Sequence, residues 1–199
     1  MGATIKGFEE SLKNKTEIQA YTVDKMSTAV VRVLDKLAQD EEIFKLLYYR
    51  DDVSLRHDLE NDPVALKAFN NRSIIKNKND MQYIKAYPFS SEPTTTEDVS
   101  IRVYFSNGAM SEANVYSKAT VTIDVICSHN LWLTSGKDIK LVRPYALVSR
   151  INKLLEDEKV NKLPTPTGFS HLTVNSVFEC IRIYAETVDI EDGGSDGDN

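Results

Sequence analysis

Cys127, His129 and Asp124 are the residues whose types and spacing come nearest to catalytic chemistry in this sequence. A histidine beside a cysteine can activate the thiol as a nucleophile. The two side chains would share one face of a strand that continued to His129. A nucleophile also needs an oxyanion site and an orienting group, which the neighbouring sequence does not supply. Because Cys127 alternates with Val121 and Val125 in a core-like pattern, we predict a structural cysteine and no catalytic residue.

The sequence contains two cysteines, Cys127 and Cys180, and each lies in an apolar run typical of a strand. We expect buried free thiols, because cysteine packs as a small apolar residue. A disulfide would require the two strands to be neighbours, and a reducing cytoplasm disfavours it. Zinc needs more ligands than two thiols, and CxxC and HxxxH patterns are absent. Gly-rich phosphate loops are absent too, so we predict neither a metal nor a cofactor.

An acid-rich stretch between residues 51 and 62 is the one place that suggests a calcium loop. Its acidic residues are Asp51, Asp52, Asp58, Glu60 and Asp62. Their spacing does not match an EF-hand, and the central glycine is missing. We therefore expect a solvated loop.

A weak basic stretch lies beside Tyr83 and contains Arg72, Lys76, Lys78 and Lys85. Positive charge next to an aromatic ring suits nucleic acid, but lysines that protect an exposed strand edge give the same pattern. Amphipathic aromatic residues of the kind enriched in interfaces are also present, and core packing explains them equally well. They are Tyr48, Tyr49, Trp132 and Tyr145.

The composition is that of one globular domain, with 199 residues, 41% apolar and 27% charged. No segment approaches the roughly 20 apolar residues of a membrane span, and the N-terminus lacks an apolar signal core, so we expect no membrane partner. The net charge is −6, and five of the six charges come from the acids of residues 189–199. A nearly neutral remainder disfavours tight, non-specific binding of nucleic acid.

Hydrophobic periodicity predicts an α+β fold in which an antiparallel sheet packs against two main helices. The first helix begins near Thr22, and its apolar stripe is Met26, Ala29, Val30, Val33, Leu34 and Leu37. The second covers 141–160, with the stripe Leu147, Val148, Ile151, Leu154 and Leu155. One or two further helical turns over 41–52 should turn Ile43, Leu46 and Leu47 inward. Strands are predicted within 81–89, 100–106, 118–128 and 171–188, with a turn at Asn107-Gly108 and a loop over 163–168.

The predicted organisation is a single domain over residues 21–188 between two flexible ends. Residues 1–20 form an N-terminal arm that orders on a partner, and residues 189–199 form a disordered acidic tail. Residues 51–80 form a long polar insertion, in which Pro63 suits the first position of a short helix. If several copies of the chain formed a ring around a DNA passage, the tails would make a negative collar that repels DNA; otherwise they would simply aid solubility, and both explanations stay open.

Two segments resemble proteins of tailed bacteriophages. The first is residues 43–52, IFKLLYYRDD, which resembles their "I-x-KLLYY…D" stretch. The second is residues 123–133, IDVICSHNLWL, followed by residues 141–155, LVRPYALVSRINKLL. It resembles a later pattern of these proteins, in which an apolar strand and a tryptophan are followed by an "RPY" that opens a helix. The resemblance is to the head–tail neck family that includes tail terminators and tail-completion proteins. It covers roughly residues 25–190. The long 51–98 insertion and the acidic tail depart from the small terminators, which leaves the neck position open.

This resemblance implies a structural virion protein that forms a homo-oligomeric ring, of hexameric or dodecameric size, between connector and tail tube. Its partners would be itself and the neighbouring connector, adaptor and tail-tube proteins. DNA would only pass through the lumen. The protein would lie in the virion, and in the host cytoplasm during assembly. The alternative function is a cytoplasmic nucleic-acid-contacting adaptor or packaging accessory, and the third is an enzyme that uses Cys127 and His129.

Overall fold

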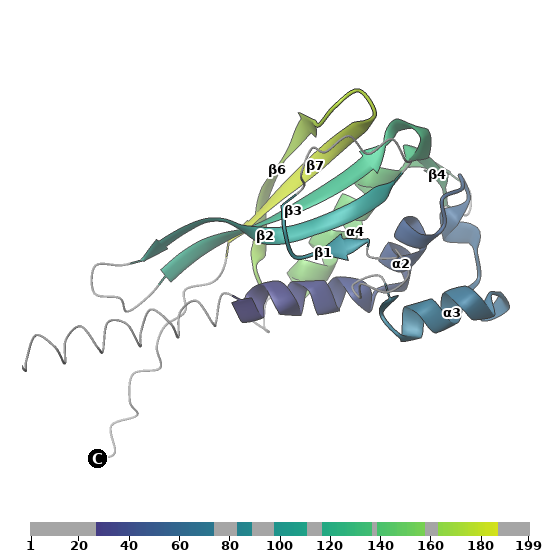
Figure 1. Ribbon diagram of the computed structural model, residues 1–199, viewed down its shortest axis with the longest axis horizontal. Coiled ribbons are helices and arrows are strands. Elements are labelled where there is room, and N and C mark those ends of the chain that lie inside the picture. Colours follow the sequence, from purple (N-terminus) through teal and green to yellow (C-terminus); the bar gives the residue numbers. More distant parts are fainter. Residues whose placement is uncertain are drawn as a thin grey trace, which may run out of the picture.

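The computed structural model describes six stretches of the chain, which are residues 27–73, 83–88, 98–110, 117–136, 139–157 and 163–186. The predicted arm (1–20) and tail (189–199), and residues 74–80 of the predicted insertion, lie outside them. The described chain has the predicted α+β fold, with a mostly antiparallel five-stranded sheet and helices packed against one of its faces (Figure 1). None of its helices is long and apolar enough to cross a bilayer.

Two of the α-helices begin directly after an aspartate that caps them. A first helix is described over residues 27–38, and Asp40 caps the next by accepting a hydrogen bond from the Ile43 amide at 2.9 Å. Asp62 likewise accepts from the Ala65 amide at 3.0 Å, with Pro63 at the first helical position as predicted. The α-helices with printed bounds are α2 (Glu41–Tyr48), α3 (Pro63–Asn70) and α4 (Arg143–Asp157). The 3₁₀ helices are η1 (Ser54–Arg56), η2 (Leu59–Asn61) and η4 (His129–Leu131).

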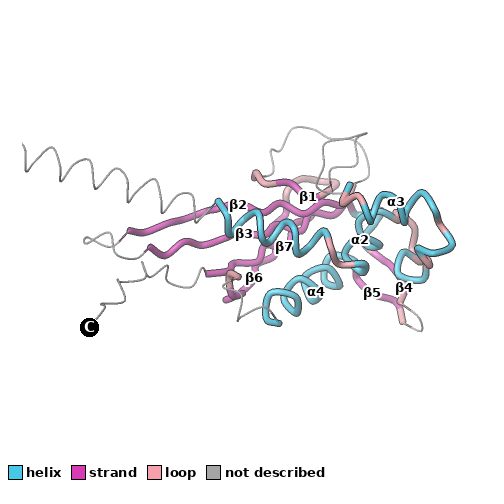
Figure 2. Tube along the Cα trace, turned by 90° about the horizontal axis from the view of Figure 1, so that it is seen from below, coloured by secondary structure: helices cyan, strands magenta, loops and turns pink. Residues whose placement is uncertain are grey.

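The five strands of the main sheet have the order β1-β2-β3-β7-β6. Only the β1–β2 pair is parallel. The strands are β1 (Ile84–Lys85), β2 (Val99–Met110), β3 (Ser117–Ser128), β6 (Thr165–Thr173) and β7 (Phe178–Glu186). A separate antiparallel pair, β4 (Leu133–Ser135) and β5 (Lys140–Val142), leads into α4. Figure 2 shows the far ends of β2 and β3 extending past the described helices as a projecting hairpin.

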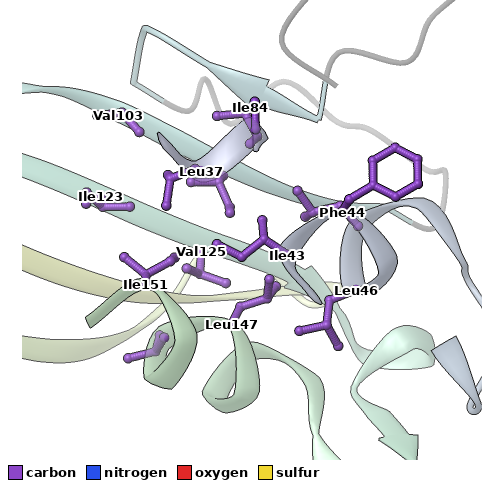
Figure 3. Close-up of a cluster of buried hydrophobic side chains, with 14 of the residues drawn as sticks. Leu37, Ile43, Phe44, Leu46, Ile84, Val103, Ile123, Val125, Leu147 and Ile151 are labelled. Carbon is purple, nitrogen blue, oxygen red and sulfur yellow. The ribbon is translucent and has the colours of Figure 1, made fainter. Parts of the chain in front are cut away.

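Side chains alternate along β2 and β3 as the sequence predicts. Ile101 and Val103 of β2 and Ile123 and Val125 of β3 are fully buried against the helices, where they meet side chains of the helical layer (Figure 3). Of the predicted helical stripes, Leu37, Leu147 and Ile151 are fully buried. Leu34 and Leu154 are only partly buried at the margin of this core.

Two predicted connections are wrong, because each belongs to a strand. Asn107 and Gly108 pair with Thr120 and Ala119 inside the β2–β3 hairpin, and an irregularity between Phe105 and Asn107 accommodates them. Residues 165–168 belong to β6, although two prolines precede Gly168. Proline is tolerated there because β6 is an edge strand of the sheet as described, and its pairing with β7 shifts between Pro166 and Gly168.

Candidate functional site

The structure places Cys127 on the helix-facing side of β3, fully buried as predicted. Its thiol donates to the carbonyl oxygen of Ser128 at 3.5 Å. Burial raises the pKa of this thiol from its ordinary value of 9.0 to about 12. The sulfur is therefore protonated at neutral pH, and a protonated thiol is a poor nucleophile.

His129 does not continue the strand face of Cys127, because β3 ends at Ser128 and His129 begins η4. It lies at the surface, with its Nε2 3.5 Å from Oε1 of Glu179 on β7. The other oxygen of Glu179, Oε2, lies 3.1 Å from Nε2 of His171 on β6. One carboxylate thus joins imidazoles from two segments that are far apart in sequence.

Trp132 completes this cluster of Glu179 with His129 and His171. Its ring stacks on His171, with centroids 6.1 Å apart, and meets His129 edge-on at 6.2 Å. Glu179 is only 18% exposed, whereas each histidine is nearly half exposed. The cluster links the end of β3 to the edge strand β6 and so holds these two strands in position.

Asp124 lies on the opposite, helix-free face of the sheet and is 2% exposed. Arg182 of β7 clamps it with two hydrogen bonds, from Nε to Oδ1 at 2.7 Å and from Nη2 to Oδ2 at 2.9 Å. The hydroxyl of Tyr104 on β2 also donates to Oδ2, at 2.8 Å, and accepts from Arg182 Nη2 at 3.0 Å. This carboxylate raises the pKa of Arg182 above its ordinary value, through the hydrogen bond between them. The network spans three adjacent strands and cross-links them on this face.

A pocket of about 250 Å³ opens beside this network. Its walls are mostly apolar and include Ile126, Leu172 and Cys180. Cys180 is a buried free thiol, as predicted, and burial raises its pKa to about 12. The strands of the two cysteines are neighbours, but Cys180 pairs with Ile126 whereas Cys127 pairs with Glu179. The thiols therefore point to opposite faces of the sheet, and both are free.

The acid-rich stretch serves mainly to cap its own helical turns. Asp58 accepts from the Glu60 amide at the start of η2, Asp62 caps α3, and Asp51 accepts from the Val53 amide. Within the described ranges, no group of three or more His, Cys, Asp or Glu side chains could hold a metal ion. Residues 54–70 of the predicted insertion are mostly helical.

The basic stretch does not form one surface in the part of the chain that can be described. Arg72 Nη1 lies 3.1 Å from Oδ1 of Asp35 on the first helix. Lys85 belongs to the two-residue strand β1, and Lys76 and Lys78 lie outside the described residues. Of the aromatic residues, Tyr48, Tyr49 and Trp132 pack against the core, and only Tyr145 is exposed.

Arg143, at the start of α4, is the largest fully buried side chain. Its guanidinium donates to four backbone carbonyls rather than to a carboxylate. These belong to Leu131 at 2.8 Å, Leu46 at 2.7 Å, Tyr49 at 2.8 Å and Asp51. Desolvation lowers the pKa of Arg143 from its ordinary value, and the carbonyl dipoles compensate the buried charge.

A protein-family model, YomW, matches residues 40–187, which is most of the chain. The chain belongs to the YomW family. This family is phage-derived, so the chain is a phage-associated protein. The resemblance of its two segments to phage proteins predicted this association. No curated protein matches the sequence.

The YomW match includes both resembling segments and the arginine that joins them. Three carbonyl partners of Arg143 lie in the first segment, and the fourth, Leu131, lies in the second. The "RPY" of the sequence is thus a fold-making motif. Asp40, which stands before an apolar run, and Arg150 are further residues of structural importance, and Arg150 Nη2 lies 2.6 Å from Asp40 Oδ2. The histidine cluster had no local signal, because its members meet only through strand pairing.

Proposed function

We propose that this YomW-family chain is a structural virion protein of the phage head–tail neck, and more specifically a tail-terminator or tail-completion subunit. It would form a homo-oligomeric ring between connector and tail tube. The phage-derived family and the resemblance of its two segments to neck proteins support the assignment to a phage particle. A role in assembly rests on the shape of the sheet.

The observation that carries this proposal is the projecting end of the β2–β3 hairpin (Figure 2). Strand β7 pairs with β3 only from Thr120 onward, and β1 pairs with β2 only at Ile101 and Arg102. The outer residues of the hairpin, among those described, therefore form a two-stranded ribbon. Such a ribbon is marginally stable in water on its own, so we expect it to pack against another subunit.

The proposed partners are further copies of the chain and the adjacent connector, adaptor and tail-tube proteins. DNA would pass through the lumen without being held, since the chain without its last eleven residues carries a net charge of only −1. Several arginines are already engaged by carboxylates. They are Arg72 with Asp35, Arg150 with Asp40 and Arg182 with Asp124. This pairing supports an assembly role over the alternative of a nucleic-acid adaptor. An assembly role in the neck would place the protein in the virion.

Native mass spectrometry of the full chain over a range of concentrations tests the proposal, together with negative-stain electron microscopy. We expect one closed oligomer of annular shape. A monomer at every concentration would contradict the ring. Tight binding to duplex DNA at low salt, without oligomers, would support the adaptor function instead.

A further inference from the structure

The outer edge of β6 has no partner strand in the described structure, where β6 pairs only with β7. Residues 167–173, TGFSHLT, contain no Lys, Arg, Asp or Glu. Phe169, in the middle of this stretch, is 64% exposed. Pro166 and the irregularity beside it protect only the beginning of the strand.

A second open edge lies on the opposite side of the same sheet. Strand β1 covers β2 at Ile101 and Arg102 only, and no other described strand pairs with that side of β2 from Val103 to Met110. These residues, VYFSNGAM, also contain no Lys, Arg, Asp or Glu. The open stretch is nearly as long as β6, which has nine residues.

Exposed strand edges are usually protected, because their unpaired N–H and C=O groups recruit other strands. The common protections are lysine, proline, bulges or very short length. Most of β6 and the outer part of β2 lack charged protection. Because neither stretch contains Lys, Arg, Asp or Glu, bringing the two together would bury no such side chain of either edge. Main-chain hydrogen bonds would then provide the attraction.

From these two edges we infer that β6 of one copy pairs with the outer part of β2, residues 103–110, of the next copy. This inference rests on the proposed ring and names the surface through which its subunits meet. The two edges differ and lie at opposite ends of the strand order, so each added copy presents a new open edge. Such a head-to-tail contact closes into a ring when the rotation between successive copies permits it, and otherwise extends as a filament. Pairing of β6 with β6 would instead be two-fold and would stop at a dimer.

Cysteine cross-linking of the full chain can test this contact, because the native thiols of Cys127 and Cys180 are buried and have pKa values raised to about 12. We would combine Ser170→Cys on β6 with Ser106→Cys on β2. Ser170 pairs with Arg182, and Ser106 accepts a hydrogen bond from Thr122, so both belong to the helix-free face. A short bismaleimide can still join the two cysteines if one strand is displaced along the other by two residues, which is about 7 Å.

We expect the double variant to give a ladder of covalent oligomers that ends at the ring size. Ser149→Cys on α4, combined with Ser106→Cys, is the matched control, because Ser149 is exposed but belongs to a helix and not to either strand edge. The yield should exceed that of the control by about tenfold or more, since apposed thiols have millimolar effective concentrations. Efficient dimer formation by Ser170→Cys alone would show β6–β6 pairing and overturn the inference.

A second variant tests the edge without cross-linking. Phe169→Lys adds a charge to β6 and should shift the oligomer towards monomer, whereas Tyr145→Lys, at an exposed aromatic residue on α4, should not. A ring seen by native mass spectrometry that gives no ladder above the control, or that tolerates Phe169→Lys, would overturn this contact and leave the proposed function standing. A wild-type chain that is always monomeric would overturn both.

Discussion

Nη1 of Arg143 donates a hydrogen bond to the carbonyl oxygen of Leu46 at 2.7 Å, across 97 residues of sequence. The bond joins the first turn of α4 to the last turn of α2, where carbonyl groups lack helical partners. Nη1 also donates to Tyr49 at 2.8 Å. A buried cation therefore takes the place of a C-terminal cap and fixes the angle between two helices of the core.

Replacing Arg143 by lysine should strongly destabilise the fold. One ammonium group cannot reach all four carbonyls that the guanidinium serves, and each buried carbonyl left without a donor costs about 1–3 kcal/mol. We expect the free energy of unfolding, measured by urea denaturation, to fall by about 3 kcal/mol. Arg56→Lys is the control, because Arg56 donates to the Gly136 carbonyl at an exposed site. An equal loss in both variants would contradict this role for Arg143.

Stability should decrease as the pH rises above about 9, because the two thiols resist ionisation in the fold. Their folded pKa values are raised to about 12 from an ordinary 9.0, so the unfolded chain releases protons first. The protonated thiols make their full contribution to the stability of the fold below the thiol pKa of the unfolded chain. This contribution is lost as the pH rises toward the thiol pKa of the folded chain. The slope should approach about 1.4 kcal/mol per pH unit for each thiol.

Urea unfolding in reductant, from about pH 8 to about pH 10.5, measures this slope. Cys127→Ala should cost about 1 kcal/mol at neutral pH and remove its share of the pH dependence. A parallel labelling experiment at neutral pH should show slow reaction of the native thiols with maleimide. Rapid labelling of Cys127 would restore the thiol-enzyme hypothesis.

Breaking the clamp on Asp124 should also be costly. Asp124→Ala leaves the Arg182 guanidinium partly buried without its carboxylate, and we expect a loss of about 3 kcal/mol in the free energy of unfolding. Tyr104→Phe removes one hydrogen bond and should cost about 1 kcal/mol. Asp35→Ala, which breaks the exposed pair with Arg72, should cost less than about 1 kcal/mol. Similar losses for Asp124→Ala and Asp35→Ala would show that burial adds nothing to this pair.

Alanine substitutions should separate the centre of the core from its margin. Leu37→Ala and Leu147→Ala should each lower the free energy of unfolding by about 2–5 kcal/mol, because both side chains are fully enclosed. Leu34→Ala and Leu154→Ala should cost clearly less, since both are only partly buried. Thermal or urea unfolding of the four variants provides the comparison. Equal costs at all four positions would mean that the helices pack differently from the structure.

Much of the fold follows from short-range patterns in the sequence. Alternation from Ile101 to Phe105 and along residues 121–127 defines two strands and their inward faces, because successive strand side chains point to opposite sides. The stripe that contains Leu147 and Ile151 defines α4, since helical side chains repeat every 3.6 residues. Pro63 marks the start of α3 for an equally local reason.

Other features depended on tertiary pairing and could not be obtained from local patterns. Asn107-Gly108 has the sequence of a tight turn, yet the longer β2–β3 register absorbs it into the hairpin. Glu179 meets His129 and His171 only because β7 lies between β3 and β6 in the sheet.

The sequence by itself determined the type and the faces of the main elements, because these depend on side chains a few residues apart. Only the tertiary structure decided which strands are neighbours, and therefore that β6 is an open edge of the described sheet and that the cysteines lie on opposite faces. It also decided that Arg143 holds α2 to α4. Contacts between residues distant in the chain depend on the packing of the whole core, so no local spacing could reveal them.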